Sequence, residues 1–249
     1  MTIFHRPALA IVLALFSTAA LAAEDHHPHW TYEGSEGPEH WSSISPEFSA
    51  CSLGQHQSPI DLAKAQQGDN VELALGWTPF APVVLNNGHT IQAVAASDNT
   101  TTFSGKTYAL QQMHFHHPSE HAIDGKRAPM EAHFVNKGSD GKLLVLGVLI
   151  DEGAANPQIA ELWQVAPQSQ GEAKTKEPVD FAKLVPLTSK FYRYSGSLTT
   201  PPCSEAVEWV VFADPITASR EQIDAFAHLY PANSRPLQAP HERTITLGR

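Results

Sequence analysis

Hydrophobic and polar residues alternate along several short stretches of the chain, which is the pattern of strands that bury one face. Runs of strand-forming residues occupy positions 71–75, 89–94, 101–103, 143–150 and 206–212. The run at 143–150 is apolar on both faces, which indicates a central strand buried on both sides. Glycine dipeptides such as Asp140-Gly141 mark turns between the runs.

Helix signals are fewer and shorter than strand signals. They occupy residues 157–163, 178–184 and 219–229, and the last of these opens with Ser219 as an N-cap. The 19 prolines and the long irregular stretches fit a large sheet wrapped in loops. The pattern therefore predicts a mostly β fold with few short helices and long loops. No internal repeat or linker-like change of composition is visible, so we expect a single domain.

The first residues have the pattern of a secretory signal peptide. A short positive start precedes an unbroken apolar run at residues 8–16, and a small-residue cleavage pattern follows at residues 20–22. The apolar run is too short to span a bilayer, which takes about 20 residues. We expect residues 1–22 to be removed on export and residues 23–249 to form the domain of a periplasmic or secreted protein. A buried N-terminal helix is the alternative.

Charge and cysteine content narrow the choice of partners and compartment. The chain has 249 residues and a net charge of −10, which argues against nucleic acid or an anionic membrane as a partner. Membrane insertion is not expected, whereas association into an oligomer stays possible. The two cysteines are Cys51 and Cys203, and an even pair in an exported chain suggests one disulfide. Two separate buried thiols are the alternative.

One strand-like run carries two imidazoles on the same face. Successive side chains of a strand point to opposite faces, so His114 and His116 share a side with Gln112. Residues 131–135 have the same period and add His133, after a segment that holds a turn signal. Antiparallel pairing of the two runs would bring the three imidazoles together. Three neutral imidazoles with a fourth position for water are typical of catalytic zinc, which acts on water as a Lewis acid.

Other polar residues near these histidines are suited to support such a site. Gln112 and Glu131 each precede a candidate ligand by two residues on the same strand face, where they are placed to accept a ring proton. His117 faces away from the ligands and is excluded, and His121 is interpreted as a buried support. Candidate hydroxyl groups lie in residues 197–202, whose tandem prolines fix the backbone.

Short segments spread over nearly the whole mature chain match one known family in the same order. They are residues 30–32, 37–41, 57–61, 86–89, 112–121, 131–133, 145–147, 197–202 and 233–238. Through these segments the chain resembles the α-class carbonic anhydrases of the exported bacterial kind. The resemblance implies a central, largely antiparallel, twisted sheet. It also implies reversible hydration of carbon dioxide to bicarbonate and a proton.

The resemblance assigns roles to individual residues. It implies that His114, His116 and His133 bind one Zn²⁺ ion. It further implies that the Thr199 hydroxyl donates to Glu120 and accepts from the zinc-bound hydroxide. Residues matched to substrate binding are Val135, Val145, Leu198, Thr200, Val207 and Trp209. Residues matched to ligand support or to the ordering of water are Tyr32, Asn87, Gln92, Gln112, Glu131 and the backbone of Asn233.

In the mechanism that the resemblance implies, zinc-bound hydroxide attacks carbon dioxide and water then replaces the bicarbonate. His89 is matched to the group that carries the remaining proton away through water, and an ordinary histidine pKa of about 6.5 suits this role at neutral pH. Cys51 and Cys203 match the disulfide of exported members. Inhibition by sulfonamides and small anions is also implied.

Three other classes of protein are alternatives to this interpretation. A cupin-type enzyme would bind iron or manganese through these histidines and Glu120, but Tyr108 stands where the cupin motif has glycine. A non-catalytic carbonic-anhydrase-like domain would lack one or more of the three histidines, and all three are present. A metallo-β-lactamase-like hydrolase does not fit, because no aspartate stands two residues after His116.

Overall fold

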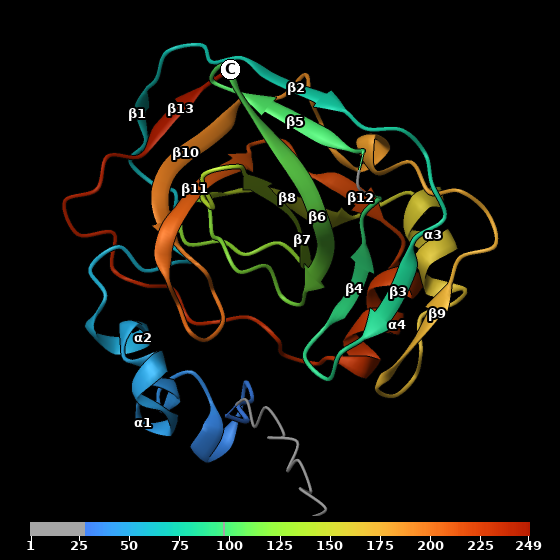
Figure 1. Ribbon diagram of the computed structural model, residues 1–249, viewed down its shortest axis with the longest axis horizontal. Helices are drawn as coiled ribbons and strands as arrows, with labels where there is room; N and C mark the ends of the chain where they lie inside the picture. The colour runs from blue at the N-terminus through green and yellow to red at the C-terminus, as the bar shows by residue number, and fades with distance from the viewer. Residues whose placement is uncertain (1–27, 97) are drawn as a thin grey trace, which may run out of the picture.

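One curved sheet occupies the centre of the computed structural model, which describes residues 28–96 and 98–249 (Figure 1). Its strands are β1 (Gln66–Gln67), β2 (Leu73–Gly76), β3 (Val83–Asn86), β4 (Ile91–Val94), β5 (Thr100–Phe103), β6 (Lys106–His116), β7 (Met130–Gly138), β8 (Leu143–Glu152), β9 (Gly171–Lys174), β10 (Phe191–Ser197), β11 (Glu205–Phe212), β12 (Ile216–Ala218) and β13 (Thr246–Gly248). The α-helices are α1 (Trp41–Ile44), α2 (Ala50–Leu53), α3 (Pro157–Trp163) and α4 (Arg220–Leu229). Short 3-10 helices are η1 (Gly34–Glu36), η2 (Pro46–Phe48) and η3 (Phe181–Leu184). The predicted mostly β fold is confirmed.

Hydrogen-bonded neighbours in the sheet follow the order β1-β13-β10-β11-β8-β7-β6-β4-β3-β9. Strand β5 pairs with β2 and β6, and β12 pairs with β8. Parallel pairs in the described part of the chain are β1 with β13, β11 with β8, and β12 with β8, while the remaining neighbours run antiparallel. The sheet is therefore largely antiparallel, as expected. The run at 143–150 is indeed a central strand, because β8 lies buried between β7 and β11.

The two faces of the sheet bury different side chains. On one face, Phe115 of β6 packs into the main core, where its ring lies 4.8 Å from that of Trp163 in α3. On the other face, a smaller apolar cluster contains Trp209 of β11. Side chains alternate along a strand, so the residues on either side of Phe115, His114 and His116, point toward this second face.

The helix predictions differ in their outcome. Helix α3 covers the predicted residues, and α4 begins directly after Ser219, whose side chain forms a capping box with Gln222. An α-helix was expected at 178–184, but only the 3-10 helix η3 (Phe181–Leu184) forms in this segment, so the prediction is wrong for residues 178–180. Val179, just before η3, instead pairs through its backbone with Phe80, which holds the chain extended at this point.

Cys51 in α2 and Cys203 in the loop before β11 form a disulfide, so the predicted pairing is confirmed. It joins the N-terminal helices to the loop that carries Thr199. Among the residues that the structure describes, no helix combines the length and the apolar character needed to cross a membrane. The predicted signal peptide, residues 1–22, lies outside the described residues.

Candidate active site

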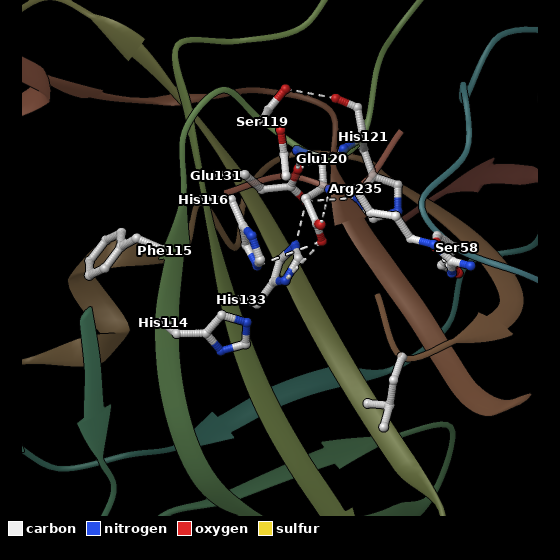
Figure 2. A network of polar contacts seen from close by, with 12 residues as sticks. Ser58, His114, Phe115, His116, Ser119, Glu120, His121, Glu131, His133 and Arg235 are labelled. Carbon is white, nitrogen blue, oxygen red and sulfur yellow. Dashed lines mark hydrogen bonds and ion pairs between the residues drawn. The ribbon is translucent and has the colours of Figure 1, made fainter. Parts of the chain in front are cut away.

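The three predicted metal-binding histidines converge on one point beside the sheet (Figure 2). Strands β6 and β7 pair antiparallel, with His114 opposite His133 and His116 opposite Glu131. The ring centroids of His116 and His133 lie 4.5 Å apart, and that of His114 lies 5.0 and 5.2 Å from them. Phe115 points to the opposite side of β6 (Figure 2). Strand alternation and the turn signal therefore placed the histidines correctly.

One nitrogen of each histidine ring already forms a hydrogen bond, so the other nitrogen is the one available to a metal ion. The hydrogen bonds are His114 Nδ1 to Gln112 Oε1 at 2.8 Å, His116 Nδ1 to the Asn233 carbonyl oxygen at 2.8 Å, and His133 Nε2 to Glu131 Oε1 at 2.9 Å. Each partner atom is an acceptor, so each engaged nitrogen carries the proton. The free nitrogens are Nε2 of His114, Nε2 of His116 and Nδ1 of His133.

These three residues fit a metal ion. One nitrogen from each lies within 4.8 Å of the other two, and His116 Nε2 is buried with no hydrogen-bond partner in the described structure. Burial, reinforced by the other two histidines, holds the pKa of His114 well below its ordinary value, and burial also lowers the pKa of His116. Neutral imidazole is the form that binds metal. Three such rings are the donor set of catalytic zinc sites.

Glu131 is the centre of a hydrogen-bond network behind His133. Its Oε1 also accepts from Nδ1 of His121 at 2.8 Å, and its Oε2 accepts from the backbone N–H groups of Glu120 and His121 at 2.9 and 2.8 Å. Burial by itself raises the pKa of Glu131, but the electrostatic interactions and hydrogen bonds of this carboxylate with His121 and His133 outweigh burial and hold its pKa well below its usual range. Glu131 therefore stays a carboxylate and orients His133.

Room for the Glu131 carboxylate comes from a glycine on the neighbouring strand. Gly147 of β8 pairs opposite His133, and a Cβ atom at this position would come within 2.9 Å of Glu131 Oε1 and 3.2 Å of Val211. A glycine inside a strand often marks such a close approach. The sequence pattern gave Gly147 no role, although an isolated glycine in an apolar run was a signal for one.

Glu120 lies beside the free ring nitrogens with half of its carboxylate unpartnered. Oε1 accepts from the backbone N–H of Arg235 at 2.9 Å. Buried Oε2 has no hydrogen-bond partner and lies 3.6 Å from His116 Nε2 and 3.9 Å from His133 Nδ1. Thr199 is buried in the bend after β10, and within the described residues no hydrogen bond joins its hydroxyl to Glu120. The Thr199 to Glu120 contact therefore stays a prediction.

A cavity of about 130 Å³ borders His114 and His116. Predicted site residues that line it are Tyr32, Asn87, His89, Gln92, Gln112 and Thr200. The structure thus brings the residues matched to water ordering to one cavity. A larger cleft of about 390 Å³ lies around Arg193 at the opposite end of β6, and none of the predicted metal ligands lines it.

His89 lies half-buried at this cavity, with its ring stacked on that of Trp30. The ring centroids are 3.8 Å apart and the planes differ by 6°. Burial and, to a lesser extent, the nearby His29 lower the pKa of His89 from its ordinary value. Trp30 was assigned no role from the sequence, although it stands in one of the matching segments.

The residues matched to the carbon dioxide pocket gather on the same face of the sheet as the histidines. The cluster contains Val145, Val207 and Trp209 as buried members, with Val135 and Leu198 packed against them. The Trp209 ring lies 4.9 Å from that of His133. An apolar wall therefore borders the candidate metal centre directly.

Arg235 was not among the predicted site residues, yet it connects the site to the disulfide. Its guanidinium donates to the carbonyl oxygens of Ser58 and Cys51 at 2.8 and 2.7 Å and to Gln57 Oε1 at 2.8 Å. Burial lowers the pKa of Arg235 to about 10, against the charge of Glu120, which raises it. Its place in a matching segment was the one sequence signal for this residue.

Comparisons with known proteins point to one family. Residues 36–248 match the family model described as eukaryotic-type carbonic anhydrase. The carbonic anhydrase of Pectobacterium atrosepticum is 44% identical over 238 residues, which cover 95% of this chain and 97% of that protein. The carbonic anhydrase of Neisseria gonorrhoeae is 40% identical over 242 residues, 96% of each chain.

A solved structure leads to the same family. The α-carbonic anhydrase of Thermovibrio ammonificans, in complex with the inhibitor sulfanilamide, aligns with a TM-score of 0.86 at 42% identity and covers 88% of this chain and 99% of that chain. The family-model match, residues 36–248, includes the strands that carry the three histidines. The chain therefore belongs to the α-class, or eukaryotic-type, carbonic anhydrase family.

Proposed function

We propose that this protein hydrates carbon dioxide reversibly to bicarbonate and a proton, with one zinc ion held by His114, His116 and His133. Family membership implies the reaction. The observation that carries the metal assignment is the convergence of three ring nitrogens, each left free by a hydrogen bond on the other side of its ring. When bound, zinc would supply Lewis-acid activation of a water molecule at the fourth position.

The groups behind the histidines would fix their tautomers before any metal arrives. Gln112, Glu131 and the carbonyl group of Asn233 each accept a ring proton, so each free nitrogen is a lone pair aimed at the common point. Partners of this kind also raise the basicity of the ligand and limit its rotation.

Glu120 and Thr199 would orient the nucleophile. A buried carboxylate oxygen without a partner is unfavourable, and Glu120 Oε2 is such an atom. We infer that it accepts the hydroxyl proton of Thr199. A hydroxyl has one proton, so Thr199 would then offer the nucleophile only lone pairs and would accept the nucleophile's own proton. That constraint would direct a lone pair of the nucleophile at the substrate carbon.

The apolar wall would hold the substrate, with Thr200 at the polar edge. Carbon dioxide is small and carries no charge, so Val145, Val207 and Trp209 match it better than they match bicarbonate. The charged product, bicarbonate, would bind this apolar wall more weakly than carbon dioxide does, which favours release of the product. Val135 and Leu198 would complete the wall.

His89 would carry the proton between the cavity and the solvent. It is half-buried, it borders the same cavity as His114, and its lowered pKa keeps its ring neutral and able to accept a proton at neutral pH. Transfer would pass through water ordered by Tyr32, Asn87 and Gln92, which share the cavity lining.

We infer that the protein is exported, with residues 1–22 as its signal peptide, and that it acts in the periplasm or outside the cell. The disulfide supports this, because disulfides persist in oxidising compartments. Sulfonamides are expected to bind at the histidines, since the related Thermovibrio protein was solved with sulfanilamide. Small anions are expected to compete at the same place.

Stopped-flow hydration of carbon dioxide, before and after chelation and zinc return, tests the function. We expect about one zinc per chain by elemental analysis, loss of activity on chelation, and recovery with zinc. Sulfanilamide should inhibit the zinc-loaded protein. Full activity without metal, or recovery with iron or manganese but not with zinc, would contradict the proposal.

A further inference from the structure

One short loop supports three parts of the candidate site. We call residues 233–235 the brace segment. Its first residue, Asn233, is 117 positions after His116 in the sequence. Its hydrogen bonds to the site are His116 Nδ1 to the Asn233 carbonyl oxygen at 2.8 Å, the Arg235 N–H to Glu120 Oε1 at 2.9 Å, and Asn233 Nδ2 to the His89 carbonyl oxygen at 3.0 Å. A displacement of the brace segment would therefore disturb a metal ligand, the carboxylate and the proton carrier together.

Asn233, the first residue of the brace segment, is held by His117, the residue directly after β6. The backbone N–H of His117 donates to Asn233 Oδ1 at 2.7 Å, and the backbone N–H of Asn233 donates to the carbonyl oxygen of His117 at 3.0 Å. Asn233 is 1% exposed, so these bonds are shielded from water.

The other end is held from outside the cavity by Arg127, which belongs to the segment between β6 and β7. Its Nη1 donates to Ser234 Oγ at 3.1 Å, and its Nη2 donates to the carbonyl oxygen of Arg235 at 3.0 Å. Two nitrogens of one planar guanidinium thus bind two consecutive residues, a geometry that an ammonium group does not reproduce. Within the described residues Arg127 makes no ion pair with a carboxylate, so its donors serve the brace segment.

We infer that Arg127 is a positioning residue for the carbonic anhydrase site, acting through the brace segment on His116 and Glu120. The inference rests on the proposed zinc site and adds a residue that touches neither ligand nor substrate. His117 and Glu120 lie in the same turn segment as Arg127, so the turn and the loop are joined at three points. Loss of the Arg127 contacts would leave the junctions at His117 and Glu120 but release the side chain of Ser234 and the carbonyl group of Arg235, so the loop could shift relative to the turn.

Such a movement would change reaction geometry more than substrate binding, because the apolar wall stands mainly on β7, β8 and β11. Loss of a direct partner of a ligand typically reduces metal affinity or activity roughly 10- to 100-fold. Arg127 acts one step further away, so Arg127→Met should lower kcat by about 3- to 10-fold with KM nearly unchanged. Zinc release to a chelator should accelerate by a similar factor.

Three further variants isolate the cause. Arg127→Lys keeps the charge but loses the two-pronged contact, so we expect it to behave much like Arg127→Met. Ser234→Ala removes one of the two bonds and should give an intermediate effect. Lys126→Met removes a neighbouring exposed cation from the same turn and should change neither kcat nor zinc release. All variants are assayed below their thermal midpoints, which are measured in parallel.

The outcomes separate this inference from the proposed function. A wild-type protein without zinc or hydration activity would overturn the proposed function, and the inference with it. If the wild type is active and Arg127→Met matches it in both kcat and zinc release, the inference alone is overturned. Full activity in Arg127→Lys would overturn it too, because charge alone would then suffice. If Arg127→Met does not fold, Ser234→Ala decides by the same two measurements.

Discussion

The inner and outer parts of the candidate site are held in different ways. Around the convergent nitrogens, each histidine ring is bound to an acceptor, and Glu131 is completely buried. At the outer end, the ring of His89 stacks on Trp30, and no hydrogen bond to that ring is present among the described residues. Metal binding needs fixed geometry, whereas a proton carrier must exchange between cavity and solvent. Substitutions inside should therefore abolish the chemistry, and substitutions outside should change only proton delivery.

The sharpest way to break this comparison is to remove an inner ligand. His133→Ala leaves two imidazoles, so we expect zinc content to fall far below one per chain and hydration to be lost. Elemental analysis and stopped-flow hydration measure the two effects. His228→Ala, which removes an exposed histidine of α4, is the control and should change neither. Near-stoichiometric zinc in His133→Ala would show that the metal assignment is wrong.

The next largest effect should come from the inner groups that orient the nucleophile without binding metal. Thr199→Ala should lower kcat by about 10²- to 10³-fold, the range seen when a positioned hydrogen bond is removed. Glu120→Gln should act in the same direction, since an amide can donate where the carboxylate only accepts. Zinc content should stay unchanged in both. Wild-type rates in the two variants would show that neither residue orients the nucleophile.

An outer substitution should affect only proton delivery. His89→Ala should lower kcat in weak buffer by at most about 10²-fold, the lower end of general acid–base contributions. Added imidazole should restore much of the rate, because a soluble base can replace the missing one. Zinc content and the rate in concentrated buffer should match the wild type. If weak buffer reveals no difference, another group carries the proton.

The smallest effect should be a shift in pH dependence. His89 accepts protons only when neutral, so kcat in weak buffer should rise with pH through its pKa, which burial and then His29 hold below the ordinary value. Trp30→Ala exposes the ring and should raise this pKa, which moves the rise to higher pH. His29→Ala should move it in the same direction by less. NMR titration of His89 measures both shifts, and a shift to lower pH would contradict the stated causes.

The inner site was largely predictable from the sequence because its geometry is local. His114, His116 and His133 lie on two strands that follow each other in the sequence, joined by residues 117–129, so alternation and one pairing fix their relative positions. The exclusion of His117 follows from the same alternation, and its ring contacts the carbonyl oxygen of Pro231 instead.

The supports were less predictable because they depend on contacts between distant segments. No periodic pattern connects Arg127 to Ser234, or Trp30 to His89. Strand β10 was also missed, although Phe191, Tyr192 and Tyr194 were a usable signal. It pairs on one side with β11, which follows after seven residues, and on the other side with β13, which is distant in sequence. The segment at 178–184 shows the opposite error, where local helix propensity yielded to a backbone pairing with Phe80.

The hairpin that carries the three imidazoles has a consequence for the order of folding. Closing a short loop costs less chain entropy than closing a long one, and contacts close in sequence form faster. The ligand set on β6 and β7 can therefore assemble as soon as this hairpin forms. The contact between His116 and Asn233 must wait for residues 117 positions apart to meet. A nascent chain would thus possess metal affinity before it possesses a finished catalyst, and zinc present at that stage would favour the native strand register.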